Sequence, residues 1–110
     1  MQIAKTFSAT LFAASLAMVL GNGAARASTV TVTISNYTFV PAVVVVHPGD
    51  TVTWANQDSN PHTATAIDGK SFDSGAIDPG ASWHFTFSKA GDYSYHCSIH
   101  PDMHGMVTVK

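Results

Sequence analysis

The chain has 110 residues, of which 45% are hydrophobic and only 11% are charged, and its formal net charge is −2 at pH 7. This length suits one domain. The hydrophobic content excludes an intrinsically disordered chain, and the mild acidity excludes a protein that binds nucleic acid through a basic surface.

The first segment has the pattern of a secretory signal peptide. Lys5 gives a positive start, residues 7–20 are apolar and uncharged, and the tripeptide at 25–27 has alanine at the two positions that a signal peptidase reads. The apolar run is shorter than the roughly 20 residues that span a bilayer. We therefore expect cleavage of residues 1–27, export to the periplasm, and a mature domain of residues 28–110 without a membrane span.

The start of the mature domain alternates between polar and apolar residues, as half-buried β-strands do. Residues 28–35 place valine and isoleucine on one face and threonine on the other, and Pro41 interrupts the pairing that follows. Residues 42–46 and 51–55 flank a turn at 47–50 that contains proline and glycine. We predict that these two segments form a hairpin.

The second half of the domain continues in short strands. Residues 62–66 alternate weakly, and the glycine-containing stretch 68–82 is predicted to be mainly loop. Strong strand patterns cover 82–87 and 93–97, with aromatic residues on the inward face, and residues 106–109 form a last strand. No segment of the mature chain has a helical period. Seven or eight short strands separated by turns predict an all-β sandwich or barrel.

A cluster of soft metal ligands lies near the end of the chain. Cys97, the only cysteine, is followed at intervals of three by His100 and Met103. A thiolate, an imidazole and a thioether together suit copper better than other common biological metals. A single cysteine forms no internal disulfide, so a bound metal would both occupy the thiol and stabilise a small exported domain.

A further ligand should come from a distant and rigid element of the chain. His62 is the best candidate because it opens a strand directly after a proline, although a surface histidine at a strand end is the plain alternative. Strand alternation turns Cys97 inward and therefore turns His96 outward. By the same rule His84 faces solvent, and His47 lies in a turn, so these three histidines are predicted not to be ligands.

Several short motifs extend over essentially the whole mature chain. They are Pro41, the turn and strand at 48–54, Asn60-Pro61-His62, the segment 90–97, and the stretch that ends at 105–107. In these motifs the chain resembles the cupredoxins, small blue copper proteins of the plastocyanin and amicyanin group. The Cys-x-x-His-x-x-Met spacing most resembles amicyanin. The resemblance implies a Greek-key β-sandwich of the cupredoxin type and one type 1 copper ion.

The resemblance also implies which residues bind the metal. The implied ligands are His62, Cys97, His100 and Met103. Met106 is a rival axial ligand because plastocyanin-like ligand loops are longer, but it begins the last predicted strand and is expected to pack in the core. Many relatives have asparagine where this chain has Thr63, which affects the bracing of the cysteine loop. His104 lies outside the motif and is either an exposed loop residue or an extra metal-binding or partner contact.

Two histidines, a cysteine and a weak axial methionine accommodate cuprous and cupric copper with little rearrangement. The predicted function is therefore electron transfer, not catalysis, since the site offers no open position for a substrate. By resemblance, His100 is the expected electron port. A redox partner such as a c-type cytochrome or a periplasmic dehydrogenase would dock there transiently on a monomer.

Three other functions are weighed against electron transfer. A periplasmic copper carrier or chaperone would bind copper reversibly, with exposed residues such as His104 and Met106. A structural zinc module would need a closed site such as Cys97, His62, His100 and His104, and methionine is a poor zinc ligand. A cysteine hydrolase would pair Cys97 with a histidine, but nothing else in so short a chain predicts a pocket or an oxyanion hole.

Overall fold

The computed structural model describes residues 26–110. The predicted signal peptide, residues 1–27, lies almost wholly outside this part of the chain, and its cleavage stays a prediction. Between residues 26 and 110 there is no helix long and apolar enough to cross a membrane. All regular secondary structure in this range is β-strand.

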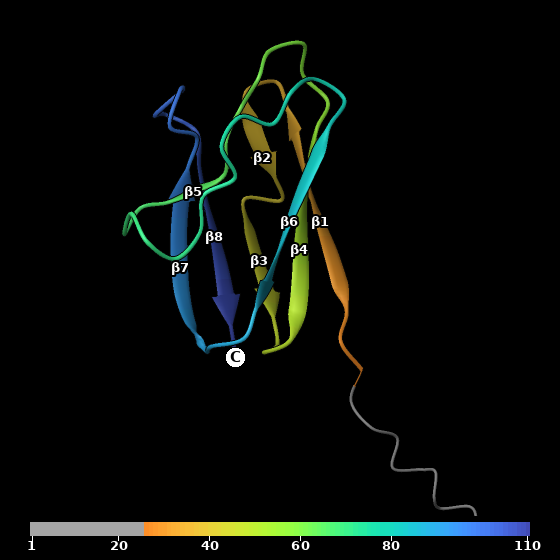
Figure 1. Ribbon diagram of the computed structural model, residues 1–110, viewed down its shortest axis with the longest axis vertical. Helices are drawn as coiled ribbons and strands as arrows, with labels where there is room; N and C mark the ends of the chain where they lie inside the picture. The colour runs from red at the N-terminus through yellow and green to blue at the C-terminus, as the bar shows by residue number, and fades with distance from the viewer. Residues whose placement is uncertain (1–25) are drawn as a thin grey trace, which may run out of the picture.

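Eight strands form two four-stranded sheets that pack against each other (Figure 1). One sheet has the strand order β2-β1-β4-β6 and the other has the order β3-β8-β7-β5. In chain order the strands are β1 (Thr29–Ser35), β2 (Thr38–Val40), β3 (Val43–Val46), β4 (Asp50–Asn56), β5 (Thr65–Ala66), β6 (Ser82–Phe87), β7 (Gly91–His96) and β8 (His104–Val109). The predicted all-β sandwich is confirmed.

The predicted hairpin between residues 42–46 and 51–55 is wrong. β3 pairs in parallel with β8 in one sheet, whereas β4 pairs with β1 and β6 in the other. The turn between β3 and β4 therefore carries the chain from one sheet to the other. Val52 still faces inward as the alternation predicts, and Val46 of β3 also belongs to the core that lies between the sheets.

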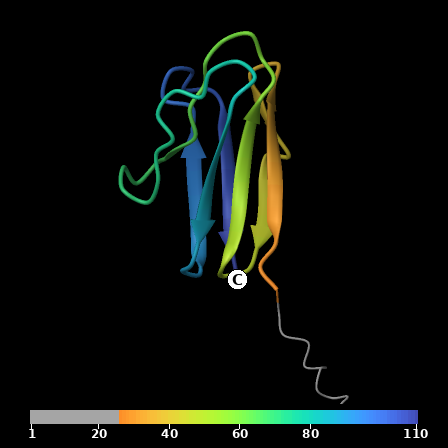
Figure 2. The same ribbon diagram turned by 45° about the vertical axis from the view of Figure 1, so that its right-hand side comes forward.

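The strand directions gather several chain segments at one end of the sandwich. β4 and β7 end there, β8 begins there, and the turn between β1 and β2 lies at the same end, opposite the C-terminus (Figure 2). Segments that are far apart in the sequence thus meet around one group of loops.

Aromatic side chains from both sheets fill the core. The ring centroid of Tyr95 in β7 lies 5.4 Å from that of Trp54 in β4 and 4.8 Å from that of Phe39 in β2. Phe72, in the loop before β6, stacks on Trp54 at 5.5 Å. These rings and the buried valines form one hydrophobic cluster. The predicted inward face of residues 93–97 is confirmed.

The ring of Tyr95 lies directly against Gly105, its register partner on β8. A Cβ atom at Gly105 would overlap the hydroxyl end of that ring. Burial raises the pKa of Tyr95 to about 12, so the hydroxyl stays neutral at physiological pH and its burial involves no charge. Glycine is required at position 105 by this contact.

Gly105→Ala is expected to lower the free energy of unfolding by about 1–3 kcal/mol, because the added methyl group displaces the Tyr95 ring from a packed core. Urea unfolding followed by circular dichroism measures the change. The control is the same substitution in a Tyr95→Leu background, where the ring is absent and the cost of Gly105→Ala should be much smaller. Equal costs in both backgrounds would contradict the contact.

Candidate metal centre

Three of the four predicted metal ligands meet at the loop end of the sandwich. The Sγ atom of Cys97 lies 3.8 Å from Nδ1 of His62 and 3.6 Å from Nδ1 of His100. The two Nδ1 atoms are 3.2 Å apart. His62 and Cys97 are fully buried, and His100 is half-buried. The three donor atoms thus form a compact triangle in which only His100 reaches the surface.

This triangle has the size that a bound metal ion requires. A circle through three atoms with these separations has a radius of about 2.1 Å, close to the ~2.0–2.3 Å bonds that imidazole and thiolate donors make to zinc, a similar first-row ion. An ion in the plane would therefore lie at bonding distance from all three donors. The two imidazoles and the thiolate are the trigonal set typical of a blue copper site.

The loop that carries Cys97 and His100 is closed by its own backbone. The N–H of Cys97 donates to the carbonyl of Met103 at 3.1 Å, and the N–H of Met103 donates to the carbonyl of His100 at 2.9 Å. The N–H of His100 donates to the carbonyl of Cys97 at 3.2 Å. This is the tight loop that three closely spaced ligands require. The side chain of Met103 is buried, and its role as axial ligand stays a prediction.

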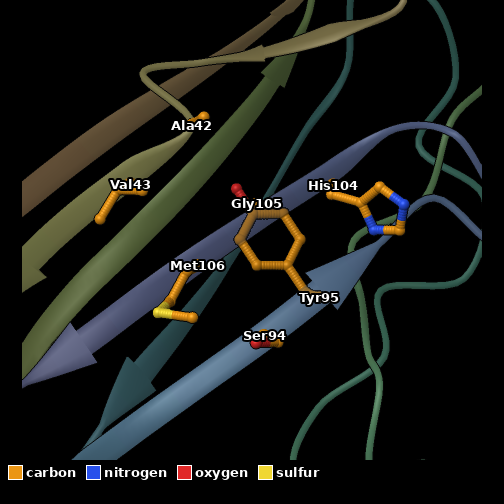
Figure 3. A pocket seen from close by; sticks show the side chains of 7 residues that line it. All are labelled: Ala42, Val43, Ser94, Tyr95, His104, Gly105 and Met106. Atoms are coloured by element: carbon orange, nitrogen blue, oxygen red, sulfur yellow. The ribbon is translucent and has the colours of Figure 1, made fainter.

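Met106 does not pack in the core as predicted. It lies on β8 beside the buried Val107 and pairs with Ser94 of β7, so its side chain lies on the outer face of the sheet. There it is half-buried and lines a shallow cavity with Val43 (Figure 3). The inward positions of β8 are Val107 and Val109, and the period of two along the strand therefore turns Met106 outward. The outer face also argues against Met106 as the axial ligand.

An acidic side chain orients the buried histidine. Oδ2 of Asp58 lies 2.9 Å from Nε2 of His62. Asp58 also accepts hydrogen bonds from the backbone N–H groups of Tyr37, at 2.9 Å, and of Asn36, at 2.7 Å. The N–H of Tyr37, together with Asn36 and His62, holds the pKa of Asp58 below its usual range. An ionised Asp58 accepts the Nε2 proton, which leaves the Nδ1 lone pair of His62 free for a metal.

Asn56 fixes the loop that carries Asp58 and His62. Its side-chain amide donates to the carbonyls of Asn60, at 2.8 Å, and Ile77, at 2.9 Å, and its Oδ1 accepts the N–H of Asp58 at 2.9 Å. His62 is held again by two backbone hydrogen bonds with Ile77, of 3.2 and 2.7 Å. The position of the histidine is therefore fixed by hydrogen bonds within the protein.

Tyr37 covers the centre from the turn between β1 and β2. Its ring meets the rings of both His62 and His100 edge to face, with centroid distances of 4.9 and 4.7 Å. Its hydroxyl donates to Oδ1 of Asn60 at 2.9 Å. Asn36 and Tyr37 both have positive φ, 54° and 57°, which a two-residue hairpin turn requires. The hydrogen bonds to Asp58 offset part of the cost of this conformation.

Thr63 braces the loop that carries Cys97. Its hydroxyl accepts the backbone N–H of Ser98 at 2.8 Å and lies 2.8 Å from Oγ1 of Thr65. Its own N–H donates to Sγ of Cys97 at 3.3 Å. One buried threonine thus ties the His62 segment to Ser98, the residue after the cysteine, and places a hydrogen-bond donor on the sulfur.

His84 and His96 lie on the outer faces of their strands, as the alternation predicts, and the other two histidines also lie at the surface. His47, His84 and His104 are exposed, and His96 is half-buried on the outer face of β7. None of these four belongs to the compact donor group found among the described residues. No sequence pattern predicts the roles of Asp58 and Tyr37, because these roles depend on a contact between two loops whose residues are 21 positions apart.

Comparison with known proteins matches this chain to one family. The family model described as a Cupredoxin-like domain matches residues 6–109. Amicyanin from Paracoccus denitrificans is 38% identical over 69 residues, which cover 59% of this chain and 53% of that protein. The chain therefore spans about half the length of this relative.

Solved structures give the same match. A single-residue variant of amicyanin in its oxidised state superposes with a TM-score of 0.70 and 31% sequence identity, over 74% of this chain and 82% of that chain. A Cu-containing nitrite reductase from Thermus scotoductus SA-01 also gives a TM-score of 0.70, with 33% identity. That superposition covers 74% of this chain but only 22% of the reductase chain.

Proposed function

Because the chain belongs to the cupredoxin-like domain family, we propose that it is an electron carrier that transfers single electrons through one type 1 copper ion. The observation that carries this proposal is the triangle of Cys97 Sγ and the two Nδ1 atoms, with edges of 3.2 to 3.8 Å. Met103 would supply the weak axial bond. When bound, copper supplies a one-electron couple between its cuprous and cupric states.

The contribution of the protein is to hold its ligands still during electron transfer. Asp58 and Asn56 fix His62, and Thr63 and the closed loop fix Cys97. Ligands that hardly move keep the reorganisation between oxidation states small, which favours fast electron transfer. With all four proposed ligands bound, the copper ion would have no open coordination position for a substrate, which favours a carrier over an enzyme.

The surface around His100 supports its role as the electron port. A shallow cavity of about 370 Å³ lies here, lined by Tyr37, Ile99, His100, Pro101, Asp102 and Met103. Ile99 is 51% exposed and Tyr37 is 45% exposed, so the rim is largely apolar. Such a patch suits a small, transient contact with a redox protein, for which a c-type cytochrome or a periplasmic dehydrogenase is proposed. Periplasmic export rests on the signal-peptide pattern of residues 1–27.

Voltammetry of the copper-loaded protein tests the proposal. An electron carrier should give one reversible one-electron wave per chain and should keep its copper against a moderate chelator in both oxidation states. A copper carrier or chaperone should instead lose the metal to the chelator and give no reversible wave. That second outcome would reject electron transfer and retain copper binding.

Asp58→Asn is expected to lower copper affinity about 10–100-fold and to raise the reduction potential. The ionised carboxylate makes His62 a stronger electron donor, which favours Cu(II), and a neutral amide does so less. Chelator competition and voltammetry measure the two effects. Asp92→Asn is the control, since it removes the same charge from an exposed strand position. Equal shifts in both variants would show that net charge, and not the hydrogen bond to His62, tunes the centre.

A further inference from the structure

Two histidines outside the proposed copper centre face each other across neighbouring strands. His96 is the last residue of β7, His104 is the first residue of β8, and the two are register partners. Cys97, which follows His96, points into the core, so His96 and its partner lie on the outer face of the sheet. His96 is half-buried and His104 is exposed.

The hydrogen-bond pattern places these two side chains at the narrow spacing of an antiparallel ladder. The N–H of Cys97 donates to the carbonyl of Met103, which makes 97 and 103 a hydrogen-bonded pair. The next pair, His96 with His104, is therefore of the non-hydrogen-bonded type, in which Cα atoms are about 4.5 Å apart and side chains lie closest. Two imidazoles at this spacing can share one ion.

The surroundings of the pair are suitable for a cation. None of the four strands of this sheet carries a lysine or an arginine. On its other side, His96 is the register partner of Thr65 in β5. The hydroxyl of Thr65 donates to Oδ1 of Asp73 at 3.0 Å, so a carboxylate lies beside the neighbour of His96. His104 also borders the cavity of about 340 Å³ that Met106 and Ser94 line, which leaves room for water ligands (Figure 3).

We propose that His96 and His104 form a second, surface metal site that binds one divalent transition-metal ion, Cu(II) more tightly than Zn(II). Neutral imidazole is a preferred ligand of both ions, and first-row affinities at nitrogen sites peak at Cu(II). The site is separate from the copper centre because its side chains lie on the opposite face of β7 and β8.

Zinc titration of the Cu(I)-loaded protein tests this site, with copper content measured beforehand. Cu(I) and Zn(II) are both diamagnetic, so the imidazole signals of His96 and His104 can be followed by NMR while calorimetry counts the ions. We expect one further equivalent of Zn(II) to bind and to shift both imidazoles. Addition of Cu(II) should displace the Zn(II) from the pair.

Substitutions identify the ligands. His96→Gln and His104→Gln should each weaken Zn(II) binding at least tenfold while the variants keep their Cu(I). His84→Gln is the matched control, because His84 is also an exposed strand histidine but has Thr53 as its register partner; it should bind Zn(II) as the unmodified protein does. Absence of a further equivalent, or binding that survives both substitutions, would overturn the site without affecting the proposed electron transfer.

Discussion

A Cys97→Ser variant is expected to lose the blue colour of the copper(II) protein and its reversible one-electron wave. The colour arises from charge transfer from the thiolate to copper, and serine provides no thiolate. Copper affinity should fall by roughly 100-fold or more, because a soft thiolate is replaced by a hydroxyl that stays protonated at neutral pH. Visible absorption and chelator competition measure both effects.

The fold should survive this change, because serine is nearly the same size as cysteine and a large hydrophobic cluster fills the space between the sheets. His96→Gln is the control: His96 is the neighbour of Cys97 in the chain but lies on the outer face of β7. Its blue band should be unchanged. A Cys97→Ser protein that stays blue would show that the thiol of Cys97 is not the copper ligand. Loss of colour in His96→Gln would show that the colour does not report on that thiol alone.

Met103→Leu is expected to keep the blue colour and to raise the reduction potential. The axial thioether stabilises Cu(II) more than Cu(I), so its loss favours the reduced form. A ten- to hundredfold change in the relative affinity for the two states corresponds to about 60–120 mV for a one-electron couple. Leucine has a similar volume, so the buried position of Met103 should stay filled.

Met106→Leu is the matched control for this prediction. It makes the same chemical change two positions after His104, on the outer face of β8 and away from the donor group. The potential of this variant should equal that of the unmodified protein. A shift in Met106→Leu together with no shift in Met103→Leu would reverse the axial assignment.

The donor residues could be predicted because their chemistry is local. Cys97, His100 and Met103 lie within seven residues, and the period of two along β7 separates the inward Cys97 from the outward His96. The pairing of strands is not local. A valine strand, a Pro-Gly turn and a second strand look the same whether the chain returns to its own sheet or crosses to the other, as it does between β3 and β4.

The residues that hold the metal donors in place could not be predicted from the sequence either. Asp58 reaches His62 from four residues away, but its ionised state depends on N–H groups of Asn36 and Tyr37, which the turn between β1 and β2 brings to it. Thr63 was a departure from the family pattern in the sequence, and only the structure gives its hydrogen bonds to Ser98 and Cys97. Such contacts follow from tertiary packing and have no periodic signal.

The visible absorption spectrum of the copper(II)-loaded protein tests the central claim most directly. The trigonal arrangement of Cys97, His62 and His100 predicts one copper ion in this centre and an intense blue band that disappears on reduction and returns on reoxidation. A copper(II) complex without this band would contradict a type 1 centre and would leave reversible copper binding as the function.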